Sequence, residues 1–438
     1  MRFLAVLLFL LTTPGWSATD PVTHDFILDN GLRVLVREDH RAPVAVQMVW
    51  YKVGSFDEPP GWTGISHVLE HMLFKGTENF TAGDFSKLVR RFGGSDNAFT
   101  SYDYTAYFQK FEVSRLPLMM EIEADRMAHL VIDDEEFARE LLVVLEERRQ
   151  RTDDNPNGLA WEKFAAMTRP GSGYASPIIG WPTELDQLTA EQARDWYRRF
   201  YSPGNATLVI AGNVTVEQVR PLAERFYGRL PVGVAPIRPL PRLAAAPGER
   251  RLALRLPVQV PSLYMSWNVP TLVTHPDDFY ALTMLAGVFD GGMSARLETD
   301  LVRGREMAAG AGAGYDGITR GDGLFTVTAT PKDGVSLEAL EKAIQEELGA
   351  LRSTPPSEEE MRRVRAGVLS GRVFGMDSLF RQAMVLGQLA TLNVDWRLEN
   401  EFTERLAAVT PEDVQRVAST WLVSERLAVA QVLPEEKK

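Results

Sequence analysis

Runs of apolar residues with two different periods divide the chain into strand-like and helix-like segments. Between Phe26 and Val36, two apolar runs flank Asn30-Gly31, which predicts a β-hairpin because this dipeptide favours a tight turn. Helix-like and strand-like segments then follow one another in mixed order, which predicts the α+β class. We expect strands at 45–53, 98–111 and 206–211, and helices at 64–74, 116–130, 134–151 and 190–200.

The first residues of the chain have the layout of a secretory signal peptide. A positively charged start precedes an unbroken apolar run at 3–11, and small residues stand at Ser17 and Ala18. We therefore expect a signal peptide over 1–18, cleaved after Ser17 or Ala18, and a mature protein that is periplasmic or secreted. The alternative is a buried N-terminal strand. No stretch reaches the roughly 18 apolar residues of a transmembrane helix, so no stable membrane anchor is expected.

The middle of the chain is rich in proline. Five prolines from Pro231 to Pro247 stand among small residues without a helical period. This composition predicts a semi-rigid linker over 231–248. The linker would separate an N-terminal domain at 19–230 from a C-terminal domain at 249–438.

The two parts of the chain also resemble each other in sequence. The helix and strand expected over 188–211 match residues 409–432, and the segment 72–76 matches 287–291 at a similar spacing. Chance similarity between amphipathic helices is the alternative. We favour a duplication, because a pattern repeated at one spacing is typical of a repeated structural unit. The fold prediction is two homologous mixed α/β domains, each a sheet with helices packed on one side.

The composition limits the possible chemistry. The chain of 438 residues contains no Cys, which excludes disulfides, thiolate nucleophiles and cysteine-ligated metals. A metal site would have to use histidine and carboxylate ligands. The formal net charge is -12, from 47 basic and 59 acidic residues, so nucleic acid is not an expected partner.

One segment concentrates the scarce histidines. Only 6 His are present, and two of them stand four residues apart in His67-Val-Leu-Glu70-His71. On a helix, residues i, i+3 and i+4 share one face, so both imidazoles can bind one metal ion while Glu70 takes a proton from water. This is the H-x-x-E-H order of the inverted zincins. The alternative, two unremarkable histidines, leaves three polar side chains on an apolar helix without partners.

A catalytic zinc usually has three protein ligands, so a further carboxylate is needed. The helix predicted at 134–151 carries three candidates, Glu140, Glu146 and Glu147. Glu140 and Glu147 share one face because they stand two turns apart. Glu146 points about 100° away from Glu147 and is expected on a solvated face. Spacing alone does not choose among the three.

With these residues the chain resembles the pitrilysin-type (M16) metallopeptidases, and among them the half-length bacterial members. The resemblance covers nearly the whole chain after the signal peptide, and its motif is the H-x-x-E-H segment followed by a distant E-x6-E pair. It implies zinc (Zn2+) as the cofactor, bound by His67, His71 and Glu147, with Glu70 as the catalytic base. It implies further that Glu140 orients one of the ligands.

The resemblance also implies where a peptide substrate binds. Asn97 and Ala98 match the family's edge strand beside the metal, which binds the backbone of the substrate. The Tyr- and Thr-rich strand expected there is compatible with β-addition, by which a strand edge holds an extended peptide without reading its sequence. The implied reaction is hydrolysis of peptide bonds.

The second part of the chain differs from the first at the positions that correspond to the candidate site residues. In the family this part supplies an Arg and a Tyr that reach the substrate carbonyl. Arg303 is the candidate for the Arg position, and a surface helix residue without this role is the alternative. Ala309 stands at the Tyr position, and Tyr315 is offset by six residues. Opposite the H-x-x-E-H residues stand apolar side chains: Leu282, Leu285 and Ala286.

This departure predicts a dimer with a homologous subunit that bears the Arg/Tyr pair. The family also includes members that have lost catalysis, so a non-catalytic scaffold or assembly subunit is the main alternative. A metal-dependent amidase of small molecules is a second alternative. The complete H-x-x-E-H motif favours the peptidase.

Overall fold

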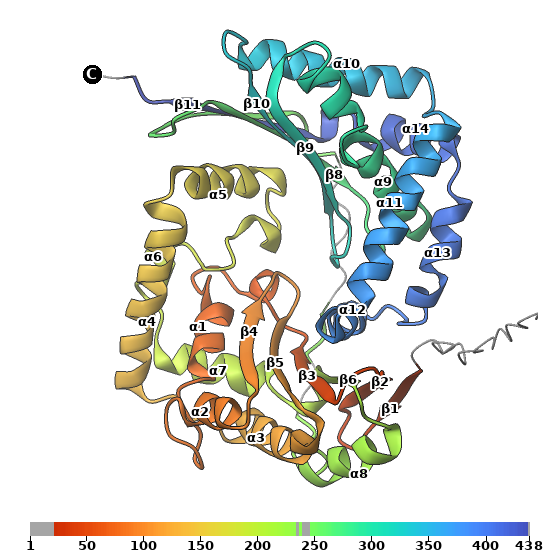
Figure 1. Cartoon of the computed structure of the whole chain (residues 1–438). Helices are drawn as coiled ribbons and strands as arrows, with labels where there is room; N and C mark the ends of the chain where they lie inside the picture. Colours follow the sequence, from red (N-terminus) through yellow and green to blue (C-terminus); the bar gives the residue numbers. More distant parts are fainter. Residues whose placement is uncertain (1–21, 234–235, 239–245, 437–438) are drawn as a thin grey trace, which may run out of the picture.

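The computed structural model describes residues 22–233, 236–238 and 246–436 (Figure 1). Two β-sheets form, one before and one after the proline-rich segment 231–248. We call residues 22–233 the first half and residues 246–436 the second half. The predicted signal peptide and its cleavage site lie outside the described residues.

The first sheet contains six strands in the order β1-β2-β6-β3-β5-β4. β2 and β6 pair in parallel, whereas the other neighbours are antiparallel. The hairpin predicted around Asn30-Gly31 is confirmed, and Gly31 has φ +87°, which glycine adopts without strain. The strands are β1 (Thr23–Ile27), β2 (Arg33–Glu38), β3 (Val44–Tyr51), β4 (Ser95–Thr100), β5 (Thr105–Glu112) and β6 (Ala206–Gly212).

The single strand predicted at 98–111 is wrong, because this segment folds into the end of β4, a turn and most of β5. The N–H of Ser101 donates to the carbonyl of Tyr104 at 2.8 Å and closes the turn. Tyrosine and threonine favour strands throughout the segment, and no glycine or proline marks the break. Ser101 and Asp103 are the weak turn signals. The hairpin makes β4 the edge of the sheet.

The second sheet contains five strands in the order β7-β11-β8-β10-β9. β7 and β11 pair in parallel and the other neighbours are antiparallel. This repeats the order and directions of β2-β6-β3-β5-β4. The predicted α+β class, with two homologous domains, is confirmed. The strands are β7 (Arg250–Leu256), β8 (Ser262–Val269), β9 (Ala308–Asp316), β10 (Gly323–Pro331) and β11 (Leu427–Pro434).

Helices cover one face of each sheet and form its main core (Figure 1). Equivalent helices in the two halves begin with the same reciprocal cap: Thr189 with Gln192 in α7, and Thr410 with Asp413 in α14. No helix in the described ranges is long and apolar enough to span a membrane. The first half contains α1 (Ile65–Met72), α2 (Asp84–Arg91), α3 (Leu116–His129), α4 (Asp134–Arg148), α5 (Pro156–Thr168), α6 (Pro182–Leu185), α7 (Ala190–Phe200) and α8 (Val216–Phe226). The second half contains α9 (Pro276–Asp290), α10 (Leu337–Ser353), α11 (Glu358–Met376), α12 (Leu379–Thr391), α13 (Leu398–Ala408) and α14 (Pro411–Trp421).

The opposite face of each sheet is covered by a helix from the other half (Figure 1). α12 of the second half packs Leu386 into a buried cluster with Trp50 of β3. α5 of the first half packs Phe164 against Ala428 and Ala430 of β11. This reciprocal exchange of helices joins the halves through two apolar interfaces.

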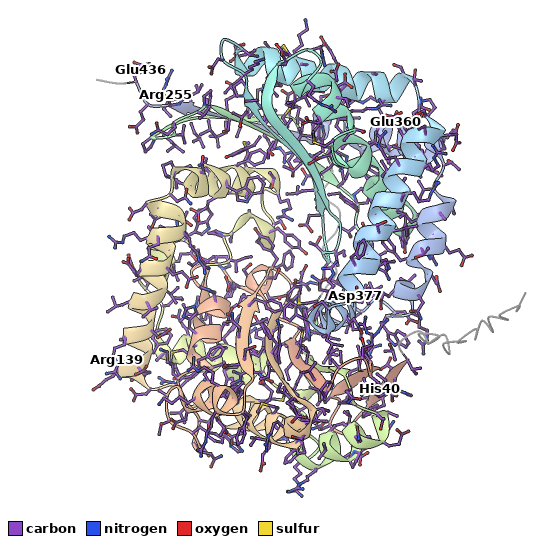
Figure 2. All side chains as sticks on the ribbon, viewed as in Figure 1. His40, Arg139, Arg255, Glu360, Asp377 and Glu436 are labelled. Atoms are coloured by element: carbon purple, nitrogen blue, oxygen red, sulfur yellow. The ribbon has the colours of Figure 1, made fainter. Side chains whose placement is uncertain are left out.

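Polar contacts add to the apolar interface between the first sheet and α12. Arg41 donates to Asp39 of its own half and, at 2.8 Å, to Asp377 of the second half. Gln382 of α12 donates to Asp39 at 2.8 Å. Figure 2 shows Asp377 just beyond α11, at the boundary of the two halves. Asp39 therefore accepts hydrogen bonds from both halves.

Candidate metal centre

α1 carries the H-x-x-E-H residues, and its start is fixed by a glycine and a carboxylate. Gly64 has φ +91°, and a Cβ there would lie 2.6 Å from the carbonyl oxygen of Ile179, so a larger residue does not fit. Glu58 accepts hydrogen bonds from the N–H groups of Gly64 and Ser66, both at 2.8 Å. These N–H groups have no acceptor within the helix, so Glu58 satisfies them. His67 follows in the same turn.

His67, His71 and Glu147 converge from two helices. Nε2 of His67 lies 3.8 Å from Oε1 of Glu147, and Nε2 of His71 lies 3.4 Å from Oε2. One ligand atom from each residue can be chosen so that all three lie within 4.8 Å of one another. α4 supplies Glu147 because it packs beside α1. Within 22–233, 236–238 and 246–436, no other three His, Asp or Glu residues are arranged in this way.

The cluster fits a zinc ion. Tetrahedral ligands about 2.0–2.1 Å from zinc stand about 3.4 Å apart, close to the separations from Glu147. Burial, with the nearby charge of His71, lowers the pKa of His67 to about 4, so this imidazole is neutral at pH 7. Nδ1 of His67 is buried without a hydrogen-bond partner among the described residues. A neutral imidazole with Nε2 facing a carboxylate is suited to bind a metal.

Glu140 holds the second histidine of the motif. Nδ1 of His71 donates to Oε1 of Glu140 at 2.8 Å, and Lys75 pairs with the other oxygen of Glu140. Burial lowers the pKa of His71, but the hydrogen bonds to Glu140 and Glu147 outweigh it and raise the pKa to about 9. Burial raises the pKa of Glu140, but His71 and Lys75 together bring it below its usual range. A carboxylate that accepts from Nδ1 leaves Nε2 directed at a metal ion.

Glu70 lies between the two histidines in sequence but is not part of the three-residue cluster. Its side chain is buried, and the hydroxyl of Thr100 at the end of β4 donates to its Oε2 at 2.5 Å. Burial raises the pKa of Glu70, and the hydrogen bond from Thr100 only partly offsets this. No described residue donates a hydrogen bond to Oε1 of Glu70. This oxygen is therefore available for proton transfer.

A cavity of about 750 Å³ opens over the cluster. Its wall includes residues of α1 and of the edge strand β4, so the cluster and the strand edge share one space. The structure thus brings Asn97 and Ala98 beside the H-x-x-E-H residues. The lining residues that bear on the chemistry are His67, Glu70, His71, Asn97, Ala98, Thr100, Glu147 and Trp161.

The second half places none of its expected residues in this cavity. Arg303 lies at the end of η6 (Leu297–Val302), half exposed, with Nε 3.2 Å from Glu298. Ala309 is exposed on β9. The hydroxyl of Tyr315 donates to the carbonyl of Pro270 at 2.6 Å, within its own half. Among residues 246–436, no arginine or tyrosine lines this cavity.

The second half has apolar packing where the first half has the cluster. Leu282 and Leu285 of α9 are fully buried, and Ala286 packs against the same core. The described part of the second half contains no group that could hold a metal ion in the arrangement found in the first half.

Three residues at the site had no clear signal in the sequence. Lys75 stands one helical turn after His71. This spacing is the only sequence signal that Lys75 could reach Glu140, the carboxylate that also accepts from His71. Thr100 reaches Glu70 only because a hairpin folds back over α1. Arg151 pairs with Glu147 and lines the cavity, although it stands in a charged run at the end of α4. Glu146 is exposed and pairs with an arginine of its own helix end, as expected.

The repeated sheets and the H-x-x-E-H helix together define an inverted-zincin type of protein. Two family descriptions match the chain: "Insulinase (Peptidase family M16)" over residues 33–180 and "Peptidase M16 inactive domain" over residues 187–368. The chain belongs to the M16 peptidase family.

Similar proteins extend over almost the whole chain. The zinc protease PqqE of Helicobacter pylori is 28% identical over 434 residues, 96% of each chain. The crystal structure of a protease from Helicobacter pylori has 27% identity and a TM-score of 0.88, covering 94% of this chain and 100% of that chain. The periplasmic protease PqqL from Escherichia coli shares the fold, with 19% identity and a TM-score of 0.78. The match to PqqL covers 94% of this chain and 47% of that one, so this chain spans about half of PqqL.

Proposed function

We propose that the protein is an exported zinc metallopeptidase that hydrolyses peptide bonds in extended peptides. One observation carries this proposal: the donor atoms of His67, His71 and Glu147 converge beside a buried Glu70, in a cavity walled by an edge strand. Relatives over nearly the full length are named zinc proteases, which supports the choice of metal and of reaction.

His67, His71 and Glu147 are the proposed zinc ligands, and Glu140 keeps His71 in the orientation and tautomer that ligation requires. A zinc ion held there would supply Lewis acidity, which acidifies water and polarises a peptide carbonyl. His67 is neutral at pH 7 and has a lone pair for a metal, which supports its assignment. The pKa of His71 is raised to about 9, so a metal ion would displace the proton from its Nε2 on binding.

Glu70 is the proposed general base. Thr100 occupies Oε2, so Oε1 takes a proton from the attacking water and later returns it to the leaving amine. Burial raises the pKa of Glu70. A raised pKa brings a carboxylate closer to the working pH and makes both transfers easier.

The peptide is proposed to bind along β4. β4 pairs with β5 on one side only, so its other edge is free of a neighbouring strand at Asn97 and Ala98. The N–H of Ala98 donates to Oδ1 of Asn97 at 2.9 Å, and a carbonyl of the peptide would replace this acceptor. Main-chain hydrogen bonds of this kind require an extended substrate and tolerate many sequences.

A homologous subunit is the proposed partner. Ala309 has no group that could reach a substrate, and Arg303 lies outside the cavity, so the chain alone lacks the Arg/Tyr pair of its family. PqqL contains about twice the length that this chain matches. That length leaves room for a further unit, and we infer that this chain obtains its second unit by association.

The proposed location is the periplasm or the outside of the cell, as the N-terminal sequence predicts. The main alternative function is a non-catalytic scaffold. The description of residues 187–368 as an M16 inactive domain agrees with the apolar packing around Leu282 and Leu285, and it concerns the part of the chain without the cluster.

The test uses purified protein without residues 1–18. Elemental analysis should find about one zinc per chain. An unstructured peptide with a quenched fluorophore should be cleaved, and a chelator should inhibit this cleavage. The assay is run with the chain alone and with a co-expressed homologous subunit, which should raise the rate. Zinc-free protein, or protein that binds zinc and cleaves no peptide in either form, would contradict the proposal.

A further inference from the structure

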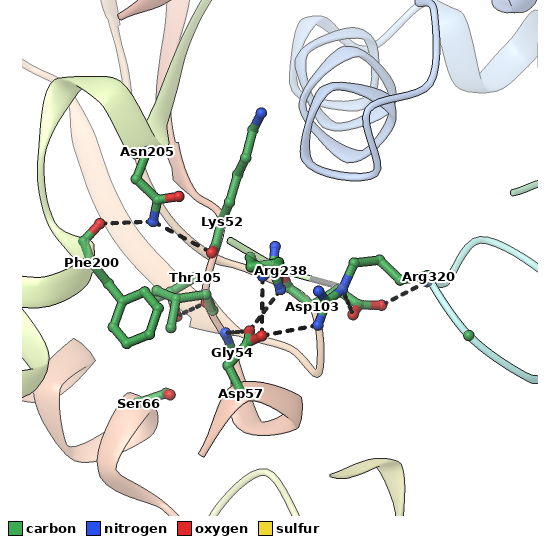
Figure 3. A network of polar contacts seen from close by, with 12 residues as sticks. Lys52, Gly54, Asp57, Ser66, Asp103, Thr105, Phe200, Asn205, Arg238 and Arg320 are labelled. Atoms are coloured by element: carbon green, nitrogen blue, oxygen red, sulfur yellow. Dashed lines mark hydrogen bonds and ion pairs between the residues drawn. The ribbon is translucent and has the colours of Figure 1, made fainter. Parts of the chain in front are cut away.

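A buried ionic network joins the second half to the hairpin that carries Thr100. We call it the inter-half network and define it by five residues: Asp57, Asp103, Tyr174, Arg238 and Arg320. Arg320 comes from the loop between β9 and β10, and Asp103 from the turn between β4 and β5. Figure 3 shows Arg320 reaching across from the second half to both aspartates.

The carboxylate of Asp103 is held by three donors. Arg320 donates its backbone N–H at 3.1 Å and its Nε at 2.7 Å. The hydroxyl of Tyr174 donates to the same carboxylate at 2.8 Å, and in turn accepts from the N–H of Gly321 at 3.1 Å. The side chains of Arg320 and Asp103 are 4% and 3% exposed, so solvent does not weaken the pair.

Asp57 is the second anchor. Nη2 of Arg320 donates to Asp57 at 3.0 Å, and Arg238 of the proline-rich segment donates to Asp57 through Nε at 3.0 Å and Nη2 at 2.6 Å. Asp57 ends η1 (Ser55–Asp57). Arg320 therefore spans two separate elements of the first half.

The hairpin turn is clamped against η1. The N–H groups of Ser55 and Phe56 donate to the carbonyls of Ser101 and Tyr102 at 3.1 and 2.9 Å. A Cβ at Gly54 would lie 2.2 Å from the carbonyl oxygen of Ser101, so glycine permits this close approach. The turn consequently has one fixed position between η1 and the loop that bears Arg320.

Thr100 stands three residues before Asp103 on this hairpin. Its hydroxyl is the group that donates to Glu70 at 2.5 Å. A rotation of the clamped turn would move Thr100, because both lie on one short hairpin. Arg238 also donates to the carbonyl of Asp103 at 2.8 Å, so Arg320, Arg238 and η1 together hold the turn next to the donor of the proposed base.

We propose that Arg320 of the second half is a positioning residue that fixes Thr100 against Glu70 through Asp103. The inference rests on the proposed role of Glu70 as general base. The second half, which has no cluster of metal-binding residues, would then contribute to the reaction. It would keep β4 and Glu70 of the first half in fixed relative positions.

The main variant is Arg320→Lys, which keeps the positive charge. A lysine has no planar fork and cannot reach both aspartates with fixed geometry. We expect kcat to fall by roughly tenfold with KM and zinc content nearly unchanged, since a small misplacement of a catalytic group reduces turnover. Arg320→Met tests loss of the charge as well, and should give the larger effect if it folds.

The matched control is Arg296→Lys. Arg296 also belongs to the second half, and it also pairs with a carboxylate through two bonds, at 2.8 and 3.2 Å to Glu360. Among the described residues, neither Arg296 nor Glu360 forms a hydrogen bond or ion pair with the first half. Its replacement should lower the melting temperature while kcat stays within about twofold, a typical result for a structural pair.

A double-variant cycle separates positioning from a merely structural role. Thr100→Val should lower kcat, and adding Arg320→Lys to it should produce almost no further loss, because both act through one hydrogen bond. If the reductions in kcat of the two single variants multiply in the double variant, the inference is overturned. An Arg320→Lys enzyme with wild-type kcat also overturns it.

Amide hydrogen exchange tests the positioning role of Arg320 without measuring turnover. Arg320→Lys should increase exchange at residues 95–104 relative to residues 44–51, and Arg296→Lys should not. If the wild-type protein cleaves no peptide, the proposed function fails while this measurement still decides whether Arg320 fixes the hairpin. Unchanged exchange at 95–104 contradicts the inference in either case.

Discussion

At the scale of single residues, hydrogen bonds would assign metal binding and proton transfer in the proposed site to different side chains. His71 is held through Nδ1 by Glu140, and Glu70 is held through one oxygen by Thr100. Nε2 of His71 is left to face Glu147, and Oε1 of Glu70 has no donor among the described residues. The two residues stand next to each other in the sequence, and their neighbours in space give them different tasks.

The first prediction concerns Glu70. Glu70→Gln should retain zinc and lose roughly 10²–10⁴ in kcat, because the amide keeps the shape of the side chain and cannot accept the proton. Zinc content and peptide cleavage measured on the same preparation check this. His71→Ala is the comparison variant and should lose both zinc and turnover. A Glu70→Gln protein with activity near wild type would falsify the assignment of the base.

The second prediction concerns the carboxylate behind His71. Glu140→Gln should weaken zinc binding by roughly 10- to 100-fold, since the amide orients and polarises the imidazole less well than a carboxylate. Competition with a chelator of known affinity measures the change. Glu136→Gln on the same helix is the control, because Glu136 lies 3.9 Å from Lys75 and makes no contact with a histidine. Equal affinities in the two variants would mean that Glu140 does not act on the metal.

At the scale of elements, the sequence predicts α1 and its candidate site residues, because these residues stand close together along the chain. The i, i+3, i+4 spacing of His67, Glu70 and His71 follows from helix geometry alone. Spacing alone does not distinguish Glu147 from Glu140 and Glu146, because the histidines that Glu147 faces lie on another helix. Thr100 has no signal in the sequence, since the hairpin that brings it to Glu70 contains no strong turn residue.

The third prediction concerns the docking of α12 on the first sheet. A Cβ at Gly387 would lie 2.0 Å from Cε2 of Trp50. Gly387→Ala should therefore destabilise the protein by about 1–3 kcal/mol, although alanine favours the helix. Denaturant unfolding measures the difference.

The control is Gly371→Ala in the interior of α11. A Cβ at this position meets no atom within 4 Å. This substitution should stabilise the protein by up to about 1 kcal/mol through helix propensity alone. If Gly387→Ala were also stabilising, α12 would not be packed tightly on Trp50.

At the scale of the whole molecule, the sequence predicted the number and kind of the sheets but not the contacts between them. The matching sequences at 188–211 and 409–432 indicated a duplication, and the structure repeats a capped helix followed by a buried strand at both places. The contacts of Arg320, Gln382 and Phe164 with the opposite half join residues that are distant in sequence. No local period or spacing reports such contacts, so they require the structure.

The fourth prediction concerns acid stability at the boundary of the halves. The hydrogen bond from Arg41, with that from Gln382, outweighs burial and lowers the pKa of Asp39 to about 2. The ordinary value is 3.8, so the native state favours the ionised form. This stabilisation is present above about pH 4 and is lost as the pH falls through about 2. Because Arg41 is half exposed, we expect it to be about 1–2 kcal/mol.

Asp39→Asn measures this contribution. The variant should be less stable than wild type at pH 6, and the difference should shrink when both are measured at pH 3 and approach zero near pH 2. Urea unfolding at each pH checks the trend. Asp377→Asn is the control, because Asp377 is 70% exposed and its removal should change stability little. A difference that grows as the pH falls would contradict the lowered pKa of Asp39.

The exchange of α5 and α12 has a consequence for biosynthesis. The ribosome adds residues from the N-terminus onward, so the strand that carries Trp50 is complete long before Leu386 exists. Until α12 has been made, one face of the first sheet presents Trp50 and its apolar neighbours to water. Such a face promotes aggregation in an unfinished chain. A product truncated after residue 147 and before residue 379 would therefore contain His67, His71 and Glu147 and still require a chaperone.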